Sequence, residues 1–261
     1  MARHAREISK TGIYHIMVRG INKEQIFKKD FYKTKLLETL KEIKTEIDFS
    51  IIAYCVMNNH LHLLAKISDV DLAMVMKRLN VTYAMFYNRL ETRYGYVFQG
   101  RFKSEAVEDD KYLLGALRYI HNNPVKAGLS DNIANYNWSS AREYINKNLV
   151  LISEQYSNEI ISLFGETSEF IKFHYLYDDN LYLDTKEEQS TNIDLIVQKS
   201  IEQFVINKGI TNQFQITPAQ KDELATILIK QNLTNIKNIS TLCNLPYSHV
   251  LTLSKTLGTD P

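Results

Sequence analysis

Cysteine is scarce in this sequence. Only Cys55 and Cys243 are present, and they lie far apart in unrelated surroundings. A disulfide framework or a cysteine-rich zinc site needs several cysteines at short intervals, so both are excluded. Cys55 lies within an apolar run, and we expect it to be a buried strand residue.

Long hydrophobic runs are also missing. No stretch approaches the roughly 18 apolar residues that a membrane-spanning helix requires, and the basic residues 1–6 lead into no apolar signal segment. The chain has 261 residues, of which 44% are hydrophobic and 23% are charged. This composition is typical of a soluble protein with one large or two modest domains, and we expect it to be cytoplasmic, with no membrane partner.

The chain as a whole has no strong excess of positive or negative charge, and its formal net charge is +1. The two parts of the chain differ, however. Residues 1–150 contain 23 Lys and Arg against 16 Asp and Glu, which gives +7, and residues 151–261 contain 8 against 14, which gives −6. A positive N-terminal part suits a protein that grips a phosphate backbone, although a solvated surface explains this modest excess as well.

Residues 1–147 alternate strand and helix patterns and are predicted to form one domain. Runs of β-branched and aromatic residues predict strands at 13–18, 49–57, 60–67 and 102–107. Apolar residues at helical spacing predict helices at 30–47, 69–94 and 111–122, the last of which should end before Pro124. The order strand, helix, strand, strand, helix, strand, helix predicts an α+β fold with a ferredoxin-like antiparallel sheet.

The character of the chain changes after residue 147. Residues 148–190 combine helical stretches with an acidic, tyrosine-rich segment, and their last part, 186–190, is predicted to be a linker. Residues 191–261 are predicted to form an all-helical domain. Within it, residues 239–251 resemble a helix-turn-helix whose turn lacks the usual glycine. A helical bundle with a structural or dimerising role is the alternative.

Two histidines separated by one residue open the predicted strand 60–67. Alternate side chains of a strand share a face, so His60 and His62 would point the same way and could bind one divalent cation. On the last predicted helix, Tyr119 and Asn123 share a face, where Asn123 could complete the metal shell beside the tyrosine hydroxyl. This arrangement suits phosphodiester cleavage. Taken singly, the histidines also fit a solvated polar face, and Tyr119 also fits ordinary packing.

Six sequence blocks stand in a fixed order along the chain: Thr11–His15, Arg19–Gly20, Met57–Leu64, Phe98–Ser104, Arg118–Pro124 and Tyr136–Ser140. Together they resemble the HUH single-tyrosine transposases, and among them the REP-associated tyrosine transposases. The resemblance spans residues 1–145, with the last third unmatched. It implies that His60 and His62 are the metal-binding pair, that Tyr119 is the nucleophile, and that Asn123 is a third ligand where the insertion-sequence relatives have glutamine.

The resemblance also implies a cofactor and a substrate. The cofactor would be Mg²⁺ or Mn²⁺, and the substrate single-stranded DNA with hairpins, at REP-like or insertion-sequence ends. Members of the family work as monomers or dimers, so a homodimer is one expectation. Tyr119 would attack the scissile phosphate and leave a 5′-phosphotyrosine link and a free 3′-OH, which allows rejoining.

Several cationic and amide side chains are candidates for contacts to the DNA strand. Arg118 would assist the tyrosine or, alternatively, form a surface ion pair. Five further residues stand at predicted loop lips beside the sheet, where capping of turns is the alternative role: Arg19, Asn22, Gln99, Arg101 and Lys103.

Three other functions are compatible with the same residues. The first is a hairpin-specific DNA- or RNA-binding regulator that does not cleave. The second is a metal-dependent hydrolase that uses water in place of Tyr119. The third is a transcription regulator in which the C-terminal helices dominate.

Overall fold

The computed structural model describes residues 7–176, 180–184, 186–210 and 216–258. The chain divides into two compact units, residues 1–183 and residues 184–261. Within the described ranges, none of the helices combines the length and the apolar character that a membrane crossing requires.

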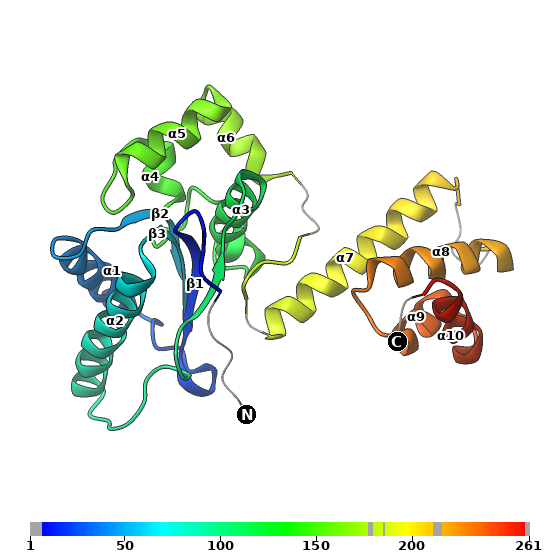
Figure 1. The fold of residues 1–261 in the computed structure, drawn as a ribbon, viewed down its shortest axis with the longest axis horizontal. Coiled ribbons are helices and arrows are strands. Elements are labelled where there is room, and N and C mark those ends of the chain that lie inside the picture. Colours follow the sequence, from blue (N-terminus) through cyan, green and yellow to red (C-terminus); the bar gives the residue numbers. More distant parts are fainter. Residues whose placement is uncertain (1–6, 177–179, 185, 211–215, 259–261) are drawn as a thin grey trace. The chain divides into compact units, whose positions relative to one another are not determined.

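An antiparallel sheet of four strands lies at the centre of the first unit (Figure 1). The strands follow the order β2-β3-β1-β4, and each neighbouring pair is antiparallel. Their bounds are Ile13–Arg19 for β1, Ser50–Val56 for β2, His60–Lys66 for β3 and Lys103–Ala106 for β4. Helix α1 (Asp30–Lys44) connects β1 to β2, and α2 (Asp69–Leu90) connects β3 to β4. This is the ferredoxin-like arrangement, so the predicted α+β fold is confirmed.

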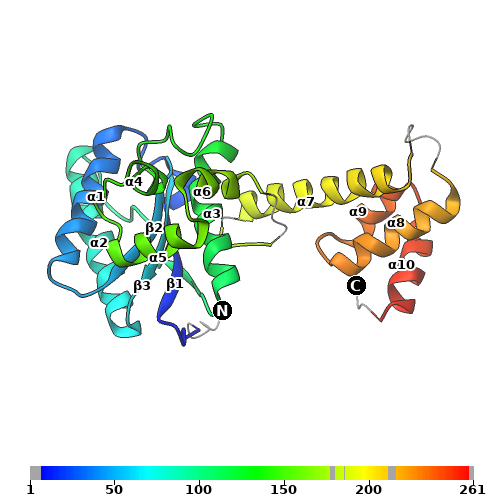
Figure 2. The same cartoon turned by 90° about the horizontal axis from the view of Figure 1, so that it is seen from above.

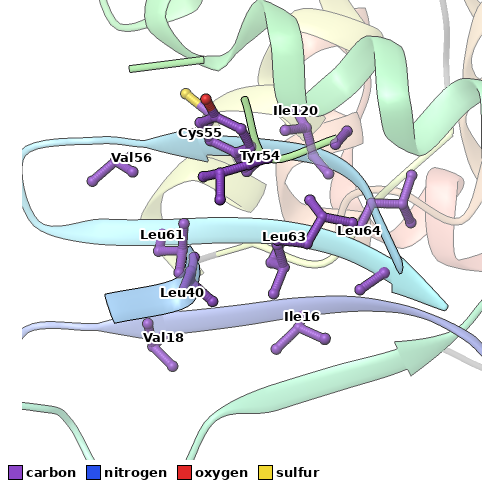
Figure 3. Close-up of a cluster of buried hydrophobic side chains, with 14 of the residues drawn as sticks. Ile16, Val18, Leu40, Tyr54, Cys55, Val56, Leu61, Leu63, Leu64 and Ile120 are labelled. Carbon is purple, nitrogen blue, oxygen red and sulfur yellow. The ribbon is translucent and has the colours of Figure 1, made fainter. Parts of the chain in front are cut away.

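The two faces of the sheet are covered by different helices. On one face, Leu61 of β3 and Val18 of β1 are buried beside Leu40 of α1 (Figure 3). Helix α2 packs along α1 on the same side (Figure 1). The other face carries His60 and His62, and helix α3 (Asp110–Lys126) packs there against β2 and β3. The alternation of side chains along β3 therefore separates the main apolar core from the histidine face.

Helix α3 begins as predicted but ends later. The Asp109 side chain accepts a hydrogen bond from Tyr112 N at 2.7 Å and caps the helix. Pro124 lies inside the helix, so the prediction that it ends there is wrong. Proline lacks an N–H, which costs one helical hydrogen bond, but the next amides still find acceptors, with Ala127 N donating to Asn123 O at 3.0 Å. The extra residues extend α3 to Lys126.

Three short helices follow in the described part of the first unit: α4 (Ala141–Asn146), α5 (Glu154–Phe164) and α6 (Thr167–His174). A buried chain of hydrogen bonds ties α6 to α3. His174 Nδ1 lies 2.8 Å from Phe170 O, His174 Nε2 lies 2.9 Å from His121 Nδ1, and His121 Nε2 lies 2.8 Å from Ser140 Oγ. The Phe170 carbonyl can only accept, so a neutral His174 donates to it from Nδ1 and accepts from His121 Nδ1 at Nε2.

The second unit is helical through its described ranges (Figure 2). Its helices are α7 (Lys186–Asn207), α8 (Pro218–Gln231), α9 (Ile236–Cys243) and α10 (Tyr247–Thr256). Residues 186–190, predicted as a linker, form the start of α7. Both cysteines of the chain are buried and unpaired, and burial raises the pKa of the Cys55 thiol, and that of Cys243 to about 11.

We expect the free energy of unfolding to fall when the pH is lowered from 7 to 5. Burial lowers the pKa of His174 to about 4 and that of His121 well below its usual value. An unfolded histidine has a pKa near 6.5 and takes up a proton in this interval, while the folded chain keeps His174 neutral. The contribution of the neutral histidine to the free energy of unfolding is thus complete above pH 6.5 and is lost as the pH falls toward 4. At pH 5 the loss is about 2 kcal/mol for each such histidine.

Urea unfolding at both pH values measures this effect. The variant His174→Gln should lose less stability between pH 7 and pH 5 than the wild type loses. The control is His249→Gln, because His249 is exposed. The same pH dependence in His174→Gln and the wild type would contradict the role given to the buried pair.

Candidate active site

His60 and His62 occupy the first and third positions of β3, and their exposed fractions are 1% and 0%. The register pairs His60 with Arg19 and His62 with Met17 of β1. Both imidazoles therefore lie on the α3 face of the sheet, with ring centroids 4.8 Å apart. Two nitrogens at this spacing on a rigid strand can act as ligands of one cation.

Neighbouring side chains orient the two rings. His60 Nδ1 lies 2.7 Å from Asn59 Oδ1, so the ring donates there and keeps its lone pair on Nε2. His62 Nδ1 lies 3.1 Å from His15 Nε2. When His62 donates to His15, its own lone pair is likewise on Nε2. Metal-binding histidines show this pattern: one ring nitrogen donates to a fixed acceptor, and the other is left to bind the metal.

His15 is a site residue that the sequence reasoning did not find. It lies on β1 and is fully buried, and burial lowers its pKa to about 3, which keeps the ring neutral and able to accept. Burial, together with the charges of His60 and His15, also lowers the pKa of His62 well below its usual value. Metals bind the neutral imidazole. The available signal was His15 at an alternate position of the first strand, but only the pairing of β1 with β3 brings it to His62.

Tyr119 of α3 faces the histidines. Its ring centroid lies 5.6 Å from that of His62 and 6.1 Å from that of His15, and its exposed fraction is 5%. Lys126 Nζ lies 4.9 Å from the centre of the same ring. The sequence reasoning missed Lys126 because it ended the helix at Pro124. The site thus combines a phenol, two neutral imidazoles and an ammonium group.

Two other predicted site residues, Asn123 and Arg118, also belong to α3. Asn123 is buried one turn after Tyr119, and its Nδ2 donates to Tyr119 O at 3.1 Å. A hard cation such as Mg²⁺ would be coordinated by the amide oxygen of Asn123. The guanidinium of Arg118 stacks on Phe173 of α6, with Cζ 4.6 Å from the ring centre, so Arg118 packs toward α6 and away from Tyr119.

A segment near residue 182 covers this face of α3. The ring of Tyr182 lies 5.3 Å from those of Tyr112 and Tyr119. It rests on Gly115, where a Cβ would overlap the Tyr182 hydroxyl oxygen. Tyr182 and Leu183 are both buried. Glycine at position 115 therefore leaves the space that the tyrosine ring needs.

Asp184, the residue after Leu183, is also buried. One ligand atom each from His60, His62 and Asp184 lie within 4.8 Å of one another, a group that could hold a metal ion. Two imidazole nitrogens and a carboxylate oxygen fit a divalent cation such as Mn²⁺, or Mg²⁺ with additional water. No local pattern in the sequence indicates Asp184, because it is far from the histidines along the chain.

The loops at one end of the sheet gather around the start of β3. Gly20 N donates to Asn59 O at 2.8 Å, Ile21 N to Val97 O at 2.9 Å, and Gln99 N to Arg19 O at 2.8 Å. Arg19 and Asn22 therefore lie beside the strand end that carries His60. Lys103 stands opposite Met17 at the start of β4. Of the residues predicted to contact DNA at these loops, Arg19 is half-buried. The other four are exposed: Asn22, Gln99, Arg101 and Lys103.

Comparison with known proteins gives consistent matches for the first unit. Residues 9–123 match the family model described as transposase IS200 like. A Haemophilus influenzae protein described as a REP-associated tyrosine transposase is 25% identical over 151 residues, which cover 54% of this chain and 85% of that protein.

Two solved structures are similar to part of the chain. A REP-associated tyrosine transposase bound to a REP hairpin is 20% identical, with 57% of this chain and 88% of that chain covered and a TM-score of 0.49. A Deinococcus radiodurans transposase is 18% identical, with 46% and 97% covered and a TM-score of 0.32.

The family match includes the sheet and most of α3, and with them His60, His62, Tyr119 and Asn123. The resemblance to tyrosine transposases that the sequence motifs indicate is confirmed, and the role of this part of the chain is transposase-like DNA processing. Residues 9–123 of this chain thus match the IS200-like transposase family.

Proposed function

We propose that this protein nicks and rejoins single-stranded DNA at hairpin-flanked sites through a covalent link to Tyr119. The observation that carries the proposal is the position of the Tyr119 ring, 5.6 Å from His62 and beside the group formed by His60, His62 and Asp184. A nucleophile next to a cation-binding group is what phosphoryl transfer by direct displacement needs. The match to the transposase family model supports DNA as the substrate. The resemblance of the sequence blocks to REP-associated tyrosine transposases supports hairpins at REP-like or insertion-sequence ends.

His60, His62 and Asp184 would hold the divalent cation, and Asn123 is a further candidate ligand. Bound there, Mg²⁺ or Mn²⁺ would polarise the scissile phosphate and offset the negative charge that grows during displacement. Asn59 and His15 would keep the two rings oriented for this role.

Tyr119 would carry out the displacement itself. Its Oη forms a bond to phosphorus while the bond from phosphorus to the 3′ oxygen breaks, and the products are a 5′-phosphotyrosine link and a free 3′-OH. The phosphodiester energy is kept in the new bond, so attack by a 3′-OH can rejoin strands and release the tyrosine. Lys126 Nζ, 4.9 Å from the ring centre, would place a positive charge beside the attacking side chain.

Access for DNA requires a movement near Tyr182. Tyr119 is only 5% exposed, His60 1% and His62 0%, and the ring of Tyr182 lies on that of Tyr119. A phosphate is larger than a water molecule, and water itself has almost no access to these groups. The substrate strand would therefore enter only when the Tyr182 ring leaves the Gly115 surface.

A hairpin-specific DNA- or RNA-binding regulator that does not cleave is the second candidate function. The burial of Tyr119 favours it, because a covered nucleophile permits binding at the exposed loops without reaction. The exposed side chains of Asn22, Gln99 and Arg101 would serve in either case.

Tyr119→Phe should abolish a covalent protein–DNA adduct while leaving hairpin binding unchanged, because only the hydroxyl is removed. The measurement is a denaturing gel of labelled hairpin oligonucleotides incubated with the protein and Mn²⁺ or Mg²⁺. Tyr94→Phe is the matched control, since Tyr94 is 96% exposed. Cleavage that survives in Tyr119→Phe would indicate a water-using hydrolase, and binding with no adduct in the wild type would indicate the regulator.

His15→Leu should weaken Mn²⁺ binding about tenfold to a hundredfold, because it removes the acceptor that orients His62. His15→Gln, which keeps a side-chain acceptor, should retain more of the affinity. Calorimetric titration of the DNA-free protein with Mn²⁺ gives the affinities independently of cleavage. Equal affinities in the wild type and His15→Leu would remove His15 from the site.

Gly115→Ala should increase the rate of adduct formation several-fold. The new methyl group overlaps the Tyr182 hydroxyl and displaces that ring, while alanine favours the helix over glycine by about 1 kcal/mol, so α3 itself is not weakened. Tyr182→Ala should act in the same direction. Tyr175→Ala is the control, because Tyr175 is 72% exposed. Slower single-turnover reaction in both variants would mean that Tyr182 belongs to the working site.

A further inference from the structure

The turn between α9 and α10 consists of residues 244–246. Asn244 adopts the left-handed conformation, with φ 48° and ψ 55°. This is the conformation for which helix-turn-helix turns commonly use glycine, and asparagine is among the few other residues that adopt it readily. Leu245 N donates to Ser240 O at 3.0 Å and Ser240 Oγ donates to Leu245 O at 2.7 Å. The absence of glycine from the turn is therefore no obstacle to a helix-turn-helix.

Helices α8, α9 and α10 pack against one another in a small core of their own. Helix α10 buries Val250 and Ser254 against α8 and α9, which fixes one side of the helix. His249 Nε2 lies 2.8 Å from Asp222 Oδ1 of α8 and adds a polar contact at the start of α10. The opposite side of α10 is held out to solvent.

The outer side of α10 carries groups that suit nucleic acid. Ser248, Thr252 and Lys255 follow one another at helical spacing, and all three are exposed. Tyr247, at the first position, is 52% exposed. The first turn of α10 has no side-chain cap, so its backbone N–H groups can face a phosphate. Hydroxyl, phenol and ammonium groups are the side chains that contact phosphates and base edges.

The net charge of α9 and α10 also favours the binding of nucleic acid. Residues 232–258 contain Lys237 and Lys255 and no Asp or Glu, which gives +2. Residues 184–261 together contain 7 Lys and Arg against 8 Asp and Glu, which gives −1. The acidic side chains of this unit therefore lie outside α9 and α10. The two acidic side chains of α8 each contact a basic partner: Asp222 pairs with His249, and Glu223 pairs with Lys208 at 2.8 Å.

We propose that α9 and α10 bind duplex DNA, with the N-terminal half of α10 in the major groove. Ser248 and Thr252 would face base edges, and Lys237 and Lys255 would contact phosphates. The polar outer stripe and the segregated positive charge favour a nucleic acid over a second protein chain as the occupant. This activity is separate from the chemistry proposed for Tyr119, and it gives the second unit a partner of its own.

The test uses the full chain and a labelled blunt duplex of about two helical turns. Fluorescence anisotropy measures their binding at several salt concentrations in the absence of divalent metal. Lys255→Gln should weaken binding and lower the slope of log K against log salt by about one. Lys230→Gln is the matched control, because Lys230 is exposed on α8. Ser248→Glu should reduce binding at least about tenfold through repulsion of the phosphates, and Thr252→Lys should strengthen it.

The proposal is overturned if the wild type binds no duplex at low salt, or if Lys255→Gln and Lys230→Gln weaken binding equally. It is also overturned if Thr252→Lys leaves binding unchanged. If Ser248→Glu alters the sedimentation of the chain and leaves duplex binding intact, the face joins two copies of the chain. Because cleavage plays no part in this assay, its outcome is independent of the experiment on Tyr119.

Discussion

The packing of α3 across the histidine face of the sheet is the constraint on which the candidate active site depends. Tyr119 comes within 5.6 Å of His62 only because α3 crosses β2 and β3 on that face. The ferredoxin-like order leaves this face free of α1 and α2, so that a third helix can occupy it. The Asp109 cap and the hydrogen bonds from His121 to α6 hold α3 at its start and along its length.

Buried neutral imidazoles recur on both sides of α3. His15 and His62 lie toward the sheet, and His121 and His174 lie toward α6. In each pair one ring donates to the other, which requires that the accepting ring is neutral. Burial supplies this condition by lowering the pKa of all four. The helix that carries the proposed nucleophile thus lies between two histidine pairs that need the same protonation state.

Local periodicity explains why much of the fold could be predicted from the sequence. The shared face of His60 and His62 follows from alternation within one strand, and the Tyr119–Asn123 spacing follows from one helix turn. His15 could not be assigned because its contact depends on the register between two strands. Lys126 was lost with the misplaced helix end at Pro124. Asp184 joins the histidines through a contact between distant parts of the chain, which no short pattern reveals.

The two cysteines also have a practical consequence. The thiolate is the form that reacts with maleimides, and burial of Cys55 and Cys243 both shields their sulfurs and disfavours that form. A single cysteine introduced at an exposed position such as Ser248 or Tyr94 would therefore be the reactive thiol at neutral pH. The native protein is thus already suited to site-specific dye attachment, so that the motions of each unit can be followed by fluorescence without first removing its own cysteines.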